Sequence, residues 1–233
     1  MERDPHFRAA ADDADPAPRP SETATSSEAN YILPSGEYVL RALETRRSVG
    51  SGFLAEPGPN EEELRRMLTI ATRVPDHGKL EPWRLLVFQG DARLQPGERL
   101  AAIYRQEHHF MGAERLEKLT GAMSRVFSYA PLVVLVISSP ALLAKIPVRE
   151  QEASAAAVCM NMLHAAHAYG FGADWVTGWA ADSEDAAAFY GLDRHERVIG
   201  IIHIGTFSER PNDRPRPDLD RIVRFWAPDG GAD

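Results

Sequence analysis

The chain has 233 residues and a formal net charge of −8, with 26 lysines and arginines against 34 aspartates and glutamates. An acidic chain without a basic stripe is poorly suited to bind nucleic acid, and no apolar run is long enough to cross a membrane. The single cysteine, Cys159, excludes an internal disulfide and a zinc site made of cysteines alone. These features predict a soluble, cytoplasmic protein.

Residues 1–34 are rich in Ala, Asp, Pro, Ser and Thr and have almost no large apolar side chains. Such a segment cannot bury enough surface to offset the entropy of ordering it, so it is predicted to be a disordered tail. It lacks the features of a signal or transit peptide. The alternative is an arm that folds on a partner subunit. Residues 35–233 are then expected to form one domain with a sizeable core.

The first predicted helix, residues 37–44, ends at a pair of arginines followed by a hydroxyl, Arg46, Arg47 and Ser48. Guanidinium groups chelate the oxygens of anions in pairs, so this triplet is a candidate anion site. The alternative is a solvated helix end, where cations interact favourably with the helix dipole. Further along, Asn60 followed by three glutamates predicts the start of a second helix, which runs to about residue 72.

Residues 73–84 connect this second helix to a strand predicted at residues 83–88. A connector needs turn residues such as proline and glycine, and this one also carries an imidazole, several charged side chains and a tryptophan. Binding groups are often displayed on loops that are held between two rigid elements. We therefore predict that this loop is the centre of a binding site.

The rest of the chain alternates helices and strands. Two helices are predicted within residues 98–128, with a break near residues 108–112. The uninterrupted β-branched run at residues 132–137 is typical of a central strand that is covered on both faces. Further elements are expected at residues 173–179 (strand or extended loop), 184–190 (helix capped by Ser183), 198–206 (buried strand) and 219–225 (added strand).

The most apolar predicted helix spans residues 151–169. It is apolar nearly all round, so it should be buried on more than one side. This burial is compatible with a subunit interface or with the core of a monomer. His164 and His167 share a face of the helix without a matching carboxylate or third histidine, and we interpret them as packed core residues. The glycines in 198–206 indicate a place where another group approaches the backbone.

Three arginine-bearing segments, residues 46–47, 73–84 and 210–216, predict a convergent anion site in an otherwise acidic protein. Trp83, Trp175 and Trp179 could supply its aromatic walls. The sequence has no nucleophile elbow, P-loop or dinucleotide glycine fingerprint. We predict no catalytic side chain and no metal site.

Several short motifs occur in a characteristic order: Arg46-Arg47-Ser48, Arg73-Val-Pro-Asp-His77, Pro82-Trp83, Gly170-Phe-Gly, Trp175-Val-Thr-Gly178 and Gly200 to Gly205. Together they resemble the FMN-dependent nitroreductase family, and the compact subgroup within it, over residues 36–226. The resemblance implies an α+β fold with a central mixed, mainly antiparallel sheet between helices. It also implies an intertwined homodimer with two FMN sites at the interface and a C-terminal segment that reaches the partner.

By resemblance, the residues that contact FMN are Arg46, Arg47, Ser48, Arg73, His77, Trp175, Val176, Thr177 and either Arg214 or Arg216. Of these, Arg73 and His77 would come from the other subunit. The segment that resembles the family's nicotinamide nucleotide site is Ala165, Ala166, His167, Ala168, Tyr169 and Gly170. Two departures from the family stand out: Glu81 replaces the usual Gln or Asn, and Val176 replaces a basic residue.

The implied activity is a ping-pong transfer of hydride from NADH or NADPH through FMN to a small oxidant such as a nitroaromatic, quinone or enone. The cofactor carries this chemistry, while the protein supplies binding and electrostatics. Because a fold does not determine a reaction, two alternatives remain. One is a flavin-using relative that fragments flavin or removes halogens, and the other is a non-enzymatic FMN-binding protein. The sequence does not discriminate between NADH and NADPH.

Overall fold

A computed structural model of the chain describes residues 34–226. The chain divides into two units, Met1–Arg41 and Ala42–Asp233. Helix α1 (Pro34–Thr45) begins in the first unit and ends in the second. Apart from Pro34, which begins α1, the tail predicted at residues 1–34 lies outside the described residues.

The second unit contains a four-stranded sheet made of β1 (Trp83–Gln89), β2 (Leu132–Ser138), β3 (Gly172–Val176) and β4 (Arg197–Gly205). The strand order is β1-β2-β4-β3, and each neighbouring pair is antiparallel. Every residue of β2 is buried, as its β-branched run predicts. This strand lies at the centre of the sheet, whereas β1 and β3 are the edge strands of the described sheet.

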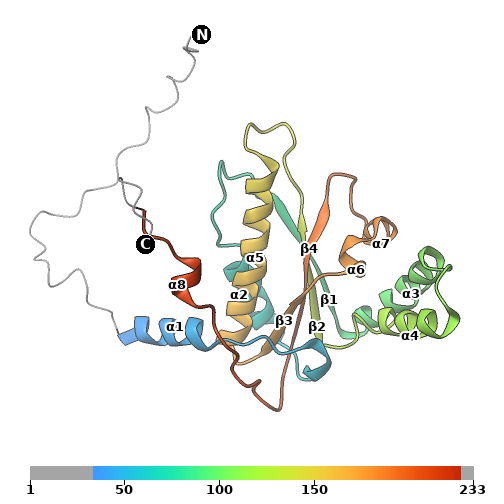
Figure 1. The fold of residues 1–233 in the computed structure, drawn as a ribbon, viewed down its shortest axis with the longest axis horizontal. Coiled ribbons are helices and arrows are strands. Elements are labelled where there is room, and N and C mark those ends of the chain that lie inside the picture. Colours follow the sequence, from blue (N-terminus) through green and yellow to red (C-terminus); the bar gives the residue numbers. More distant parts are fainter. Residues whose placement is uncertain (1–33, 227–233) are drawn as a thin grey trace, which may run out of the picture. The chain divides into compact units, whose positions relative to one another are not determined.

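Helices cover both faces of this sheet (Figure 1). One face carries α2 (Glu61–Ala71) and α5 (Val148–Ala168). The other side holds α3 (Pro96–Glu107), α4 (Ala113–Met123), α6 (Trp179–Asp182) and α7 (Glu184–Phe189). Even-numbered residues of β2 belong to the core beneath α2 and α5, and odd-numbered residues to the core beneath α3, α6 and α7. The two cores therefore follow the alternation of side chains along a strand.

Helix starts agree with the capping residues that the sequence indicates. Asn60 Oδ1 accepts from the Glu63 backbone N–H at 2.9 Å, and Glu63 Oε2 accepts from the Asn60 N–H at 2.9 Å. This reciprocal pair is a capping box. Ser183 Oγ accepts from the Ala186 N–H at 3.0 Å and starts α7. Sequence reasoning did not predict the single turn of α6, nor the short 3₁₀ turns at Ser51–Phe53 and Gly90–Leu94.

Helix α5 has 21 residues and packs one face, which includes Val158, Cys159 and Met162, into the core. Its remaining apolar side chains, such as Ala157 and Met160, are half-buried. A single chain thus buries one side of this helix, not the two that its composition predicts. Burial raises the pKa of the Cys159 thiol to about 12, so the thiolate needed for nucleophilic chemistry is disfavoured.

The added strand predicted at residues 219–225 is wrong for this chain. The structure has a short helix, α8 (Leu219–Ile222), which starts where Asp218 Oδ1 accepts from the Asp220 N–H at 3.1 Å. A strand needs a neighbour for its backbone hydrogen bonds, and this segment pairs with none of the strands described. Among the described residues, no helix is long and apolar enough to cross a membrane.

Candidate functional site

The candidate site is built around four arginines that come from opposite ends of the second unit. Arg46 and Arg47 directly follow α1, while Arg214 and Arg216 lie in the proline-rich arm after β4. Burial and then the positive charges of Arg216, Arg214 and Arg47 lower the pKa of the Arg46 guanidinium. The Arg46 guanidinium is therefore close enough to the other three to be affected by their charges, and we call the four arginines the basic cluster.

Backbone contacts hold the two parts of the basic cluster in place. Arg210 Nη2 donates to the Thr45 carbonyl at 2.8 Å, which ties the arm to the end of α1. Arg47 Nη1 donates to the Asn212 carbonyl, which ties the arm to the cluster itself. Together these contacts confirm that the arginine segments at residues 46–47 and 210–216 converge, as their sequence predicts.

The same segment is attached to β3. The Val49 N–H donates to the Ala173 carbonyl at 3.0 Å. Val49 also packs closely against Gly172. A Cβ added to Gly172 would lie 3.0 Å from Val49 Cγ2 and 2.8 Å from Leu54 Cδ2. Glycine permits this close packing because it has no side chain. Residues 175–177 therefore come shortly after Gly172 and Ala173, the residues of β3 that Val49 contacts just beyond the arginine triplet. In this stretch Trp175 and Val176 are half-buried and Thr177 is exposed.

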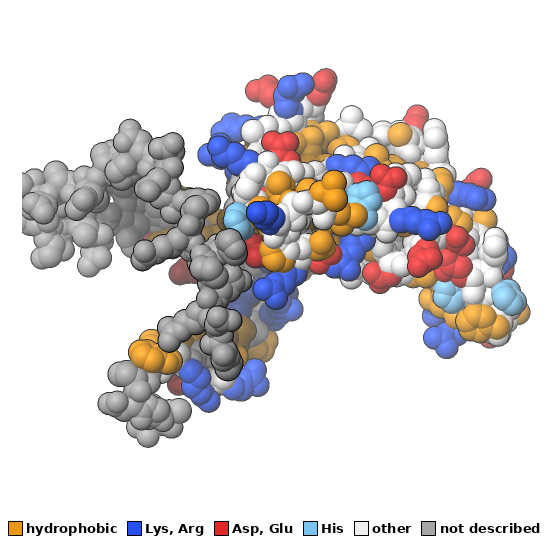
Figure 2. All heavy atoms as spheres, turned by 90° about the horizontal axis from the view of Figure 1, so that it is seen from above, with side chains coloured by type: hydrophobic (Ala, Val, Ile, Leu, Met, Phe, Trp, Pro, Cys, Tyr) orange, Lys and Arg blue, Asp and Glu red, His pale blue; other side chains and the backbone are white. Residues whose placement is uncertain are grey.

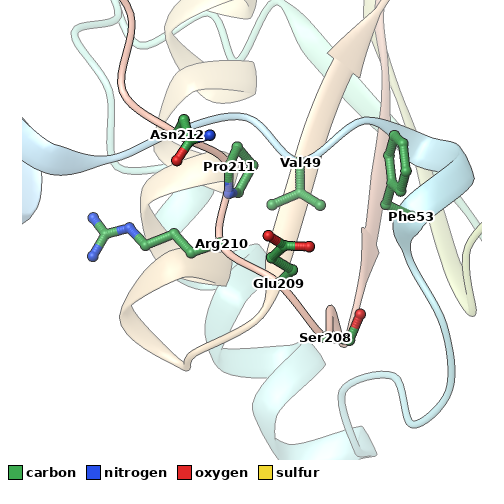
Figure 3. A pocket seen from close by; sticks show the side chains of 7 residues that line it. All are labelled: Val49, Phe53, Ser208, Glu209, Arg210, Pro211 and Asn212. Carbon is green, nitrogen blue, oxygen red and sulfur yellow. The ribbon is translucent and has the colours of Figure 1, made fainter.

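Three cavities border the basic cluster. The largest of them, of about 360 Å³, is lined by Arg214, Arg216 and Arg221 with two prolines. The second, of about 250 Å³, is lined by Val49, Phe53 and residues 208–212. Figure 3 shows Val49 and Glu209 near the centre of this second cavity, whereas the Arg210 guanidinium extends to one side. The third, of about 100 Å³, is lined by Arg47, His167 and Gly172 among others. Partly apolar walls beside clustered cations suit a ligand with a flat apolar part and an anionic group.

The prediction that His164 and His167 are packed core residues is wrong. Both residues are half-buried, and His167 lines a cavity together with Arg47 and Arg210. The pKa of His164 is lowered by burial and then by Arg46 and His167, and the pKa of His167 by burial and then by Arg210 and Arg46. Burial and then the positive surroundings thus favour neutral imidazoles at the end of α5.

The segment predicted to bind the nicotinamide nucleotide ends α5 beside these histidines. Ala165 and Ala166 are 2% and 0% exposed, so their side chains face the core. Ala168 and Gly170 are exposed, and Tyr169 is half-buried. Only the later residues of the segment are therefore accessible in a single chain.

In one chain, His77 lies apart from the basic cluster, whereas the Arg73 backbone lies only about one turn of α5 from His164. His77 Nδ1 is 2.9 Å from Glu150 Oε2 in the first turn of α5, whereas Arg46 acts on His164 near the helix's other end. Fourteen residues separate Glu150 from His164, which corresponds to about 20 Å along a helix. The Arg73 carbonyl accepts from Asn161 Nδ2 at 3.0 Å, and its side chain is exposed.

Hydrogen bonds from its own backbone to the Asp76 side chain stabilise the loop that carries His77. Asp76 Oδ1 accepts from the Leu80 N–H at 3.0 Å, and Asp76 Oδ2 accepts from the Glu81 N–H at 2.8 Å. These bonds stabilise the left-handed backbone conformations of Lys79 (φ 52°) and Glu81 (φ 47°). Residues other than glycine rarely adopt this conformation. Asp76 is therefore a structural residue of this loop.

Arg84 is also structural. It forms a bidentate pair with Glu196, Nε to Oε1 at 2.8 Å and Nη2 to Oε2 at 2.7 Å. Chiefly through this contact, the pKa of the Glu196 carboxyl falls to about 2. The charge of Arg84 is thus engaged far from the basic cluster.

The three tryptophans do not form a common wall. Trp83 and Trp175 pack against the core beneath α5, whereas Trp179 packs against the opposite core. Trp179 meets Tyr104 edge to face, with ring centroids 4.8 Å apart, and its Nε1 donates to Glu107 Oε2 at 2.6 Å. Within the arginine- and proline-rich arm, sequence reasoning assigned a ligand contact to Arg214 or Arg216 but none to Arg210, which the structure ties to the end of α1.

Comparison with known proteins gives consistent results. The nitroreductase family model matches residues 43–206. YdjA of Escherichia coli strain K12, which is named as an NAD(P)H nitroreductase, is 33% identical over 169 residues, 72% of this chain and 87% of the relative. A similarly named protein of Haemophilus influenzae is 33% identical over 174 residues, 73% of this chain and 89% of the relative.

Solved structures show the same fold. A nitroreductase-like protein from Bacillus cereus has a TM-score of 0.69 at 23% identity, covering 81% of this chain and 95% of that one. A variant of the FMN- and NADPH-dependent nitroreductase NfnB from Sphigopyxis sp. strain HMH has a TM-score of 0.62 at 19% identity, covering 80% and 97%. The family model spans most of the described residues, so this chain belongs to the nitroreductase family.

Proposed function

We propose that this chain is an FMN-dependent oxidoreductase that oxidises NADH or NADPH and reduces a small oxidant such as a nitroaromatic, quinone or enone. The basic cluster is the observation that carries the proposal, because four converging guanidinium groups suit the dianionic phosphate of FMN. Arginine binds phosphate through two parallel hydrogen bonds and stays charged when it is desolvated. The names of YdjA and NfnB support the same chemistry.

In this proposal each residue has a binding role. Arg46, Arg47, Arg214 and Arg216 hold the phosphate, and the exposed Ser48 hydroxyl is free to contact the ribityl chain. Residues 175–177 border the isoalloxazine ring, and the exposed end of the 165–170 segment approaches the nicotinamide nucleotide. Bound FMN would supply the two-electron redox chemistry. The chain's own residues position the cofactor and neutralise its phosphate, and none is required as a nucleophile.

We also infer that the active form is a homodimer. The apolar face of α5 that a single chain leaves half-buried is available to pack against a second copy. Two α5 helices that pack in antiparallel orientation would place the His77 end of one chain beside the Arg46 end of the other. This arrangement would explain why the exposed His77 lies away from the basic cluster of its own chain.

A second feature supports the homodimer. The described sheet ends at β1, and an open groove of about 600 Å³ runs between β1 and α2, lined by Leu64, Leu68, Leu85 and Val87 among others. The C-terminal arm, in contrast, exposes large apolar side chains. Figure 2 shows further apolar side chains exposed among charged ones on the face seen from above. We propose that the arm of each subunit packs along β1 of its partner.

The subunit arrangement has a direct test. Phe225 is 93% exposed in the single chain, and Phe225→Asp would place a charge in the proposed interface. We expect the wild-type protein to have twice the 25.8 kDa chain mass by light scattering, and the variant to shift toward the monomer and lose FMN. Phe110→Asp, a change at a 77% exposed phenylalanine between α3 and α4, is the matched control. A wild-type monomer that retains FMN would contradict the proposal.

The activity is tested by the absorbance spectrum of the purified full chain after incubation with FMN. We expect bound flavin whose absorbance is bleached by NADH or NADPH without oxygen, and restored by a nitroaromatic or a quinone. A protein that cannot be loaded with FMN would overturn the proposal. A loaded protein that neither nucleotide bleaches would be a binding protein. Destruction of the flavin spectrum during turnover in oxygen would indicate flavin fragmentation.

A further inference from the structure

We propose that Asp213 sets the affinity and selectivity of the basic cluster for phosphorylated ligands, because its carboxylate competes with the ligand's phosphate for the same arginines. The inference rests on the proposed function, since it concerns the phosphate site of that cofactor. It goes further in assigning an opposing role to an acidic residue, which the resemblance to the family does not include.

Asp213 makes its contacts through a single oxygen. Its Oδ1 accepts from Arg216 Nη2 at 2.6 Å and from the Arg214 backbone N–H at 2.9 Å, and it lies 3.7 Å from Arg47 Nη1. Three of the four members of the basic cluster thus meet this oxygen through a side chain or backbone. The position of Oδ1 is the one that a phosphate oxygen would take in order to bind Arg47 and Arg216 together.

Two effects of this carboxylate oppose each other. It could hold Arg47 and Arg216 in position for the phosphate, or it could repel the phosphate and occupy its donors. The positioning effect is small, because Arg47 is also bound by the Asn212 carbonyl and Arg216 lies between two prolines that stiffen its backbone. Exposed ion pairs contribute little to structure, and the Asp213 side chain is 70% exposed.

The repulsive effect acts directly on the ligand. A dianionic phosphate that reaches the basic cluster must displace Asp213 from its donors and remain next to its negative charge. Like charges a few ångströms apart repel even in a watery environment. The effect should be confined to ligands that carry the phosphate. Asp213 therefore lowers the preference for FMN over riboflavin, which has the same ring and ribityl chain without the phosphate.

Asp213→Asn tests this inference with little steric change. The asparagine retains an oxygen that accepts from the Arg214 N–H, so the main change is the loss of one negative charge. We expect the dissociation constant of FMN for the flavin-free full chain, measured by flavin fluorescence, to fall about fivefold. The dissociation constant of riboflavin should stay unchanged. Glu62→Gln, on the exposed first turn of α2, is the control for net charge.

Inorganic phosphate provides an independent readout. It should raise the melting temperature of the flavin-free Asp213→Asn variant more than that of the wild type. If wild type binds FMN but the variant binds it no more tightly, or less tightly, the inference about Asp213 is wrong while the proposed function stands. Equal tightening of riboflavin would also overturn it. If wild type binds no FMN, the proposed function fails, and the phosphate comparison alone decides the role of Asp213.

Discussion

Replacing Arg47 by alanine is expected to raise the dissociation constant of FMN by roughly 10- to 100-fold, since a hydrogen bond between charged groups contributes about 1.5–3 kcal/mol. The Arg47 side chain is only 19% exposed, so water screens its charge less than that of a surface arginine. Its loss also frees the Asn212 carbonyl, and with it the part of the arm that carries Arg214 and Arg216. Titration of the flavin-free chain with FMN measures the change.

The same change should leave folding and riboflavin binding nearly intact. Arg47 contacts an exposed arm rather than either core, so the melting temperature of the flavin-free variant should stay close to that of wild type. Arg47→Lys should give an intermediate affinity, because lysine keeps the charge but not the planar fork. Arg125→Ala removes an exposed arginine elsewhere and serves as the control. Parallel losses of melting temperature and FMN affinity would contradict a binding role for Arg47.

Local signals explain why most elements could be predicted. The caps at Asn60 and Ser183 act within three residues of each helix start, so they are visible in the sequence. The burial of β2 follows from its continuous β-branched run. Such signals depend on neighbouring residues only, whereas the α+β fold was implied by the resemblance of the ordered motifs to the nitroreductase family.

Long-range partners explain most of the failures. Helix α5 is apolar nearly all round, so its sequence does not encode which side meets the sheet, and the placement of His164 and His167 could not be deduced. Arg84 was assigned to a binding loop because its sequence neighbourhood shows no partner for its charge. Its partner, Glu196, lies 112 residues away in the sequence. The C-terminal apolar pattern suggested a strand, but a strand forms only where another strand offers an edge.

The candidate site was predictable in its composition and only partly in its geometry. The arginines at residues 46–47 and 214–216 were expected to meet because an acidic chain does not otherwise concentrate cations, and the structure brings them together. The position of Asp213 within the cluster could not be read from a run of alternating charges. Whether Arg73 and His77 join the site depends on a second chain, and no pattern in one sequence specifies that geometry.

Replacing Gly200 by alanine is expected to displace the Trp175 side chain and lower the stability of the fold. The sequence of β4 predicted that some group approaches its glycines, and at Gly200 that group is the indole of Trp175. A Cβ on Gly200 would lie 2.2 Å from Trp175 Nε1 and 2.6 Å from Trp175 Cδ1. The indole also donates from Nε1 to the Ile199 carbonyl at 3.2 Å, and this bond would be lost when the ring moves.

Overpacking of this kind costs about 1–3 kcal/mol, and each kcal/mol lowers the melting temperature of a chain of this size by about 2–4 °C. Thermal unfolding of the flavin-free chain measures the loss, and tryptophan fluorescence reports the greater exposure of the ring. Gly52→Ala is the control, because a Cβ there has no atom within 4 Å. An unchanged melting temperature in Gly200→Ala would contradict the close approach.

The clash itself is isolated by changing both partners. In a Trp175→Leu background, Gly200→Ala should cost much less stability than in wild type, because the ring that blocks the new methyl group is gone. The flavin readout should also differ from that of Arg47→Ala. If residues 175–177 border the isoalloxazine ring, Gly200→Ala should weaken FMN and riboflavin alike, since both carry the ring. A selective loss of FMN would instead place this strand near the phosphate and contradict the proposed orientation of the cofactor.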